Sequence, residues 1–214
     1  MPRVCGVPAL ALPDDGRPHR GGRPRDPSRD GAIRSAILRV LAEEGYAALT
    51  MDAVATRAGV GKATIYRRWR TKSQLVADAV VSLGDEVMVL PDSGSLEDDL
   101  RVLMRWLVTA VNGPLGAATR SLLSAMAHEP QLRAAFHGGP MEHWHALFHQ
   151  VWTRAEDRGE VRPGLAGTAI AATASAAILQ RWLFGVEPVD QAFADEVLAD
   201  VVLPLVDATC PLRR

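Results

Sequence analysis

Apolar residues recur at helical spacing along most of the 214-residue chain, whereas the period-two alternation that marks a strand is hard to find. Between residues 29 and 44 the apolar positions follow i, i+3, i+4, i+7 and i+8, which is the stripe of an amphipathic helix. Gly45 then supplies a C-terminal stop. The stripe consists of Ile33, Ala36, Ile37, Val40 and Leu41.

Two short helices joined by a glycine turn are predicted next. Thr50 is a good N-cap for a helix over residues 51–58, and Gly59 suits a left-handed turn residue. A second short helix then covers residues 62–69. The buried side of the first would contain Met51, Val54, Ala55 and Ala58.

The rest of the chain is divided by Gly and Pro into further helical segments. The pattern T-x-x-Q from Thr71 to Gln74 is a capping box, so a helix should begin there and continue to about residue 90, before Pro91. Pro204 is expected to end or bend the last helix. The segments after Pro91 cover about residues 95–112, 115–127, 130–137, 140–158, 165–185 and 190–208.

This pattern predicts an all-α protein with two domains. An N-terminal domain would cover residues 28–90, and a helical domain would cover residues 91–208. Residues 1–27 are rich in Pro, Gly, Arg and Asp and lack periodicity, which predicts a disordered arm. Residues 209–214 would form a short tail.

Charge separates the two ends of the chain, although the net charge is only −1. Residues 1–75 contain 14 Lys and Arg against 7 Asp and Glu (+7), while residues 76–214 contain 10 against 18 (−8). The first part is therefore suited to meet a polyanion. Cys5 and Cys210 form no metal-type or redox pair in sequence, and no apolar run is long enough to span a bilayer, so we expect a cytoplasmic protein.

The two short helices have the spacing of a helix-turn-helix. Ala55 is small enough for a close crossing, Gly59 makes the turn, and Ile65 locks the angle, with Trp69 one helical turn further on. The stretch GVGKAT also resembles a phosphate-binding loop, but it lacks the first glycine, the Ser or Thr after Lys62 and a preceding strand. The alternative is a hairpin that serves only as core, with a solvated basic face.

Helix 62–69 would present small and basic side chains outward. Lys62, beside the free N–H groups after Gly61, and Tyr66 suit phosphates, while Ala63 allows close approach to base edges. Arg67 and Arg68 are candidates for base reading, because a guanidinium can donate two hydrogen bonds to guanine. In the arm, Arg23 and Arg25 could lie in a narrow minor groove, or the arm could be a solvated tail.

The stretch GYAALTMDAVATRAGVGKATIYRRWRTKSQLVADAV, with the helix before it, resembles the DNA-binding domain of the TetR/AcrR family of bacterial transcription regulators over about residues 29–80. The resemblance implies a homodimer of about nine helices per chain whose C-terminal domain binds a small effector. The family's usual contacts to double-stranded DNA fall on Thr50, Lys62, Ala63, Thr64, Tyr66, Arg67, Arg68 and Lys72.

Two positions depart from the family's pattern. Gly61 stands where Ser is common, so that N-cap contact to DNA is lost, and Trp69 stands where Phe is common, so the hydrophobic plug is larger. Arginine at both 67 and 68, where His or Tyr is frequent, makes the operator sequence hard to transfer.

The last two helices carry apolar stripes that could pair with a symmetry mate in a four-helix interface. The alternative is burial of the same stripes within one chain. The stripes consist of Ile170, Ala174, Ile178, Trp182, Phe193, Val197 and Val201.

Bulky apolar residues concentrate in the acidic C-terminal part, where most would be core and some would line a cavity for a hydrophobic or aromatic effector. The candidates are Leu103, Met104, Trp106, Leu107, Leu122, Met126, Phe136, Trp144, Phe148, Trp152 and Trp182.

Two further function classes are considered. Glu142, His145 and His149 have ligand-capable spacing for zinc, but a third ligand such as His128 or His137 would have to arrive from elsewhere, so we predict no metal and no cofactor. No catalytic motif is present, so an enzyme is not expected. The sequence favours a repressor released from a pseudo-palindromic operator by its effector, with an effector-independent regulator or an activator as the alternative.

Overall fold

The computed structural model describes residues 27–83, 89–185 and 188–209, and all regular structure within these ranges is helical. This confirms the predicted all-α class. The predicted arm with Arg23 and Arg25, both cysteines and most of the tail lie outside the described residues. Within the described ranges, no helix is both long enough and apolar enough to cross a membrane.

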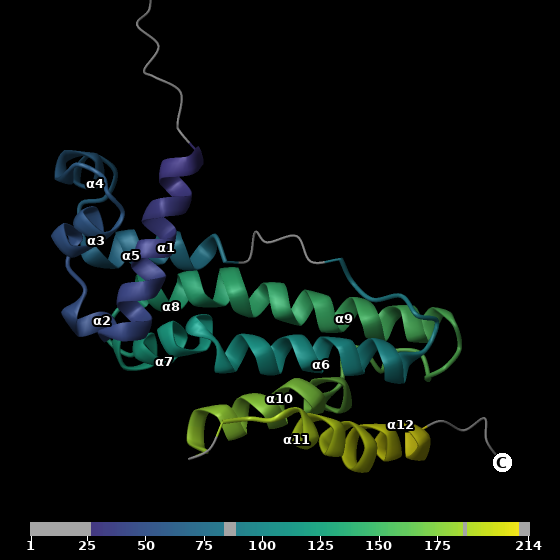
Figure 1. The fold of residues 1–214 in the computed structure, drawn as a ribbon. Coiled ribbons are helices and arrows are strands. Elements are labelled where there is room, and N and C mark those ends of the chain that lie inside the picture. The colour runs from purple at the N-terminus through teal and green to yellow at the C-terminus, as the bar shows by residue number, and fades with distance from the viewer. Residues whose placement is uncertain (1–26, 84–88, 186–187, 210–214) are drawn as a thin grey trace, which may run out of the picture.

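The N-terminal part is a compact head of five helices, drawn in purple and blue in Figure 1. Its first helix has the apolar stripe predicted from sequence, and all five stripe residues are buried. Gly45 stops that helix in the left-handed region (φ 81°), and a four-residue helix that was not predicted follows it directly. The five helices are α1 (Pro27–Glu43), α2 (Gly45–Ala48), α3 (Met51–Arg57), α4 (Lys62–Arg68) and α5 (Lys72–Val81).

Side chains cap two of these helices. The Thr50 hydroxyl accepts a hydrogen bond from the Ala53 N–H at 3.1 Å, which begins α3. The Thr71 hydroxyl accepts from the Gln74 N–H at 3.1 Å, while the Gln74 Oε1 accepts from the Arg70 N–H at 2.9 Å. The capping box is therefore present, although its return bond reaches the residue before Thr71.

Helix α5 ends at Val81 and does not continue to residue 90 as predicted. Its last carbonyls are satisfied locally, because the Ser82 hydroxyl donates to the Ala79 oxygen at 2.8 Å and the Leu83 N–H donates to the Val80 oxygen at 3.1 Å. Ser competes with helix hydrogen bonding in this way and so favours helix ends.

The C-terminal part forms the elongated body in Figure 1, in which α6 and α9 run lengthwise and α10 with α11 and α12 lies along one side. Its elements are α6 (Leu96–Asn112), α7 (Pro114–Met126), α8 (Pro130–Phe136), the π-helical turn η1 (His137–Met141), α9 (Glu142–Asp157), α10 (Ala169–Phe184), α11 (Gln191–Glu196), the π-helical turn η2 (Val197–Val202) and α12 (Leu203–Thr209).

Two prolines lie in or beside widened helical turns. The sequence predicted a break at Gly138 to Pro140, but η1 carries the helix through it, and η2 does the same just before Pro204. A proline lacks the N–H that an α-helix needs and its ring crowds the preceding turn, whereas a π-turn has more room. Pro204 therefore does not end the helix in which it lies.

Two hydrophobic clusters form the core, and they do not divide where the sequence places the domain boundary. The body cluster joins α6, α9, α10 and the last helices. The head cluster joins α1, α3, α4 and α5 with residues of α7 and α8, namely Ala118, Leu122, Met126, Leu132 and Ala135. Because α7 and α8 complete the head's core, a movement of either helix must act on the head.

Candidate nucleic-acid interface

The crossing of α3 and α4 is built from the residues that the sequence singled out. Ala55 and Ile65 are at most 1% exposed and Trp69 is 7% exposed, so these side chains lock α4 against the head. Gly59 adopts a φ of 65°, which other residues rarely tolerate. Gly61 is the N-cap of α4 without a side-chain hydrogen bond, and a Cβ added there would meet no atom within 4 Å.

The outer side of α4 is exposed at the end of the head farthest from the body, beside the first turn of α1 (Figure 1). Lys62, Ala63, Tyr66 and Arg67 are exposed on it, and Thr64 is half-buried. The 52% exposure of Tyr66 is high for an aromatic side chain. This surface can donate hydrogen bonds to phosphates and can approach bases closely.

Asp52 on α3 partners two of these side chains, and the sequence analysis missed it. The Lys62 Nζ lies 2.6 Å from the Asp52 Oδ2, and the Tyr66 hydroxyl donates to the Asp52 Oδ1 at 3.2 Å. Asp52 is two residues after the Thr50 cap, where an acid is ordinarily explained by the helix dipole alone. The signal that could have identified it is its exposed position opposite the cationic start of α4.

These contacts shift the pKa values of all three groups. The hydrogen bond from Lys62 lowers the pKa of Asp52, and the same bond raises the pKa of Lys62. The hydrogen bond to Asp52 also raises the pKa of Tyr66. Near neutral pH the site therefore holds an ammonium and a neutral phenol, both of which are donors. A DNA phosphate that binds here must take the place of Asp52 or share its donors.

Lys72 and Thr50 stand at helix ends. The Lys72 ammonium donates to the Tyr46 carbonyl at 2.9 Å and lies 4.2 Å from the centre of the Tyr46 ring, so it already caps α2. The Tyr46 hydroxyl donates to Glu129 at 3.4 Å, and burial together with the charge of Glu129 raises the pKa of Tyr46 to about 12. Thr50 is exposed and its hydroxyl caps α3.

The two adjacent arginines differ in their surroundings. Arg68 forms an ion pair with Asp30 of α1, and its guanidinium lies 4.2 Å from the centre of the Trp69 ring. Arg67 is exposed and pairs with no other described residue. Both side chains line an open polar groove between the end of α4, α5 and α8.

A second site lies in the body, where α6, α7, the last residue of α8, η1, α9 and α10 line an apolar cavity of about 80 Å³. Five of the predicted pocket residues line it: Leu107, Phe136, Trp144, Phe148 and Trp182. Three of the other six, Leu103, Met104 and Trp152, are buried in the body core, and Trp106 packs against that core. Leu122 and Met126 are buried in the head core.

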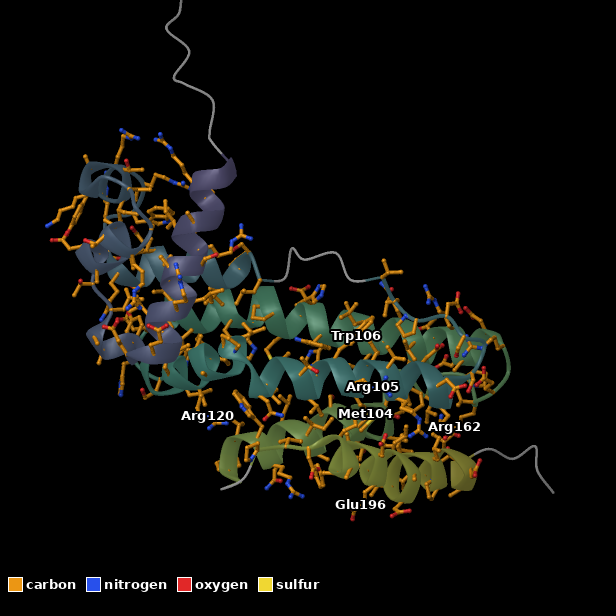
Figure 2. All side chains as sticks on the ribbon, in the orientation of Figure 1. Met104, Arg105, Trp106, Arg120, Arg162 and Glu196 are labelled. Atoms are coloured by element: carbon orange, nitrogen blue, oxygen red, sulfur yellow. The ribbon has the colours of Figure 1, made fainter. Side chains whose placement is uncertain are left out.

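The lining contains positions that the sequence did not select. Gly116, Pro140 and Met141 come from the turns that begin α7 and precede α9, and Leu179 comes from α10. Besides the indole N–H groups of Trp144 and Trp182, the polar side chains of the lining are Thr119, His145 and Ser175. Arg120 of α7, labelled in Figure 2, lies beside this cavity and not in its lining. Its guanidinium donates to the Trp182 carbonyl at 3.0 Å and lies 5.1 Å from the centre of the Trp182 ring.

The predicted dimer stripe requires a correction. Ala174, Ile178, Trp182 and Val197 are at most 7% exposed within a single chain, because they face α6 and α9, and Ile170 and Phe193 are half-buried. Of the predicted stripe, only Val201 is exposed, at 41%. Apolar residues that remain exposed on the last helices include Ala172, Ala176, Leu183, Phe184, Val201 and Leu205.

The described part of the chain contains no cluster of side chains that could form the zinc site. Glu142, His145 and His149 lie on α9, but no group of three or more His, Cys, Asp or Glu side chains that could hold a metal ion occurs among the described residues. His145 borders the apolar cavity, and the His149 Nδ1 lies 3.2 Å from the Thr153 hydroxyl.

Comparison with known proteins agrees with this geometry. The family model of bacterial regulatory proteins of the tetR family matches residues 33–79, and the model of the tetracyclin repressor-like C-terminal domain matches residues 90–201. An uncharacterised HTH-type transcriptional regulator of Mycobacterium tuberculosis is 32% identical over 186 residues, which cover 85% of this chain and 92% of that protein.

Two further similarities cover most of the chain. A DNA-binding transcriptional repressor TetR of Mycobacteroides abscessus is 32% identical over 186 residues, covering 85% of this chain and 96% of that protein. The crystal structure of the TetR family transcription regulator SCO0332 is 27% identical and covers 86% of this chain and all of its own, with a TM-score of 0.64.

These proteins are DNA-binding transcriptional regulators and not enzymes. The helix-turn-helix of α3 and α4, the helical body and the similarity along both parts of the chain lead to one conclusion: the chain belongs to the tetR family of bacterial transcriptional regulators.

Proposed function

We propose that the protein is a homodimeric repressor that leaves a pseudo-palindromic operator when a small apolar or aromatic molecule enters the body cavity. The observation that carries this proposal is that α7 and α8 belong both to the cavity and to the core of the head. These helices line the cavity on one side and complete the head's core on the other. A ligand in the cavity therefore acts directly on the helices that support α4.

On DNA, two copies of α4 would lie in successive major grooves, spaced by roughly 34–36 Å or a multiple. Lys62 and Tyr66 would contact phosphates, Ala63 and Thr64 would face base edges, and Arg67 would reach bases or backbone. Thr50 and Lys72 stand at helix ends that frame this surface. Arg23 and Arg25 would extend the contact into the minor groove.

The lining of the cavity supports an apolar effector with few polar groups. Most lining side chains are aliphatic or aromatic, and Thr119, His145 and Ser175 supply the polar contacts. The free volume of about 80 Å³ is well below the roughly 300–1,000 Å³ of sites for small molecules. A ligand that fits there must therefore push the surrounding helices apart.

The expansion would reach the head through η1. Pro140 and Met141 line the cavity, while Gly139 beside them is buried against the end of α5, where an added Cβ would lie 2.9 Å from the Val81 Cα. An effector that favours the expanded body disfavours the DNA-bound spacing, because the two equilibria are linked. The helix that transmits the movement to the head would be α5, through the contact at its C-terminal end.

Dimerisation would use the outer faces of α10 and α12. Ala172 and Ala176 allow another helix to approach closely, and Phe184 is 79% exposed. Pairing these faces with a second copy would form a four-helix interface.

A direct experiment selects duplexes from a randomised library with the purified protein and then screens small aromatic compounds for release of the selected duplex. We expect a palindromic consensus and at least one compound that weakens binding by 5- to 150-fold, the usual range of coupling between two sites, or about 1–3 kcal/mol. Selection without release by any ligand that binds the body would instead support an effector-independent regulator. Stimulation of transcription from the selected site would indicate an activator.

A further inference from the structure

The last turn of α4 carries two arginines that are adjacent in sequence but held differently. The Arg68 guanidinium contacts both carboxylate oxygens of Asp30, with one bond of 3.4 Å between Nη2 and Oδ2 and a shorter one between Nη1 and Oδ1. Only 30% of the Arg68 side chain and 32% of the Asp30 side chain are exposed. A two-pronged contact of this kind fixes orientation as well as distance.

A second interaction holds the same guanidinium. Arg68 lies over the Trp69 ring at 4.2 Å from its centre, and the Trp69 Nε1 donates to the Asp78 Oδ2 of α5 at 3.3 Å. Trp69 is itself buried in the head core. The side chains from Asp30 through Arg68 and Trp69 to Asp78 therefore connect α1, the end of α4 and α5 in one continuous series.

The position of Asp30 also favours its pairing with Arg68. It lies in the first turn of α1, where the helix dipole favours a carboxylate. If Arg68 turned away to contact DNA, it would lose both the two-pronged contact and the stacking on Trp69. It would also leave an unpaired carboxylate at the end of the head that meets the phosphates. Arg67 faces no such loss, because no ion pair joins it to any described residue.

We propose that Arg68 is a positioning residue that fastens the end of the recognition helix α4 to Asp30, and that Arg67 alone of the two reads the DNA. This departs from the expectation that both arginines contact bases. It rests on the DNA-binding role of α4 and is independent of any effector. The Asp30–Arg68 pair sets the angle at which α4 leaves the head, and so determines how well the α4 side chains meet their base pairs.

The experiment compares Arg68→Ala, Asp30→Ala, the double variant and Arg67→Ala in effector-free full-length protein. The probes are the duplex selected by the wild type and a scrambled duplex of equal length, and the readout is the ratio of the two affinities. This ratio cancels the general effect of a charge change on DNA binding. Binding is measured well below the unfolding temperature of every variant, so that a simple loss of stability does not alter it.

We expect Asp30→Ala and Arg68→Ala each to lower the ratio by about fivefold, as for a partly exposed ion pair, and the double variant to lower it by about the same factor. Both single variants should still prefer the same base at each position of the duplex as the wild type does, and their binding should have the wild-type salt slope. Arg67→Ala should lower the ratio by about tenfold and relax the preference at one base pair. Arg68→Lys, which keeps the charge but loses the planar fork, should resemble Arg68→Ala.

Base reading by Arg68 gives the opposite result for Asp30. Removal of the acid would then free the guanidinium, so Asp30→Ala would raise the ratio while Arg68→Ala abolished preference at a base pair. Three results overturn the proposal. They are this pattern, a double variant whose loss is the product of the two single losses, and single variants that both leave the affinity ratio unchanged. Asp30→Asn and Arg68→Lys provide the same comparison if an alanine variant does not fold. No effector is present, so a failure of ligand-induced release would leave the result unchanged.

Discussion

The head and the body of this regulator use their side chains in different ways. In the head, the residues proposed to meet DNA stand on an exposed surface, and some of them are held by acidic partners, as Lys62 is by Asp52. In the body, the residues around the cavity come from six elements, and several of them also belong to the hydrophobic core. Charge changes should therefore alter the head's function with little loss of stability, whereas volume changes in the body should alter function and stability together.

The largest effect is expected from Ile178→Ala in the body. Ile178 is fully buried against α6, so its truncation should lower the free energy of unfolding by about 2–5 kcal/mol. Phe184→Ala on the same helix is the control, because its 79% exposed ring contributes little to the fold of one chain. Denaturant unfolding and sedimentation should show a stability loss for the first variant and a weaker dimer for the second. A large loss of unfolding free energy in the Phe184→Ala monomer would contradict this division of α10 into a core face and an outer face.

A smaller loss of stability is expected from a substitution at the contact between the body and the head. Gly139→Ala would place a Cβ 2.9 Å from the Val81 Cα and 3.1 Å from the Val80 oxygen, and such overpacking costs about 1–3 kcal/mol. We expect lower affinity for the selected duplex without any effector, because the end of α5 must move. Gly138→Ala is the matched control, since its Cβ would meet no atom within 4 Å. Equal DNA affinities of the two variants would show that η1 does not couple the cavity to the head.

In the head, Lys62→Ala should weaken binding to all duplexes alike and reduce the salt slope of binding by about one, because a single phosphate contact is lost. Its unfolding should remain close to that of the wild type, since the Lys62 side chain is 64% exposed. Affinity measured at several salt concentrations tests this role. An unchanged slope would mean that Lys62 serves only as a partner of Asp52.

The smallest effect concerns the two tyrosines, which are the only phenols of the chain. The hydrogen bond to Asp52 raises the pKa of Tyr66, whereas the pKa of Tyr46 is raised to about 12, mainly by burial. Asp52→Asn should therefore move the pKa of Tyr66 down toward its ordinary value and leave that of Tyr46 in place. Absorbance titration of the variant, with Tyr46→Phe to assign the two phenols, measures both. A Tyr66 pKa that does not move would contradict the contact with Asp52.

Linkage gives the sign of the corresponding effect on stability. Because the folded protein holds the Tyr46 proton more tightly than the unfolded chain, this group's contribution is present below its ordinary pKa of 10.0 and is lost as the pH rises toward about 12. Asp52 behaves in the opposite direction, because its pKa is lowered in the folded state. Its contribution is present near neutral pH and is lost as the pH falls through the acid range.

The helix-turn-helix was predictable because its signals are local. The Thr50 hydroxyl and the Ala53 N–H that donates to it are three residues apart, and the turn at Gly59 needs a residue that tolerates a positive φ. The stripe of α1 follows from helix geometry alone. By contrast, the sequence did not indicate the pairing of Arg68 with Asp30, because these residues are 38 positions apart.

The body shows why apolar patterns alone do not assign function. Ile178 and Val201 both belong to the predicted interface stripe, yet Ile178 is buried in its own chain and Val201 is 41% exposed. An apolar stripe specifies that a face is covered but not by which partner. The continuous helix through Pro140 could not be read from sequence either, since the same residues ordinarily predict a break.

The amino-acid sequence by itself determined the helical class, the cationic start of the chain and the helix-turn-helix, because capping, glycine turns and amphipathic spacing act over a few residues. The tertiary structure alone decided that α7 and α8 belong to the head's core, that η1 touches both the cavity and α5, and that Arg68 is paired with Asp30 while Arg67 is exposed. Each of these depends on contacts between distant segments, and such contacts exist only after the helices have packed.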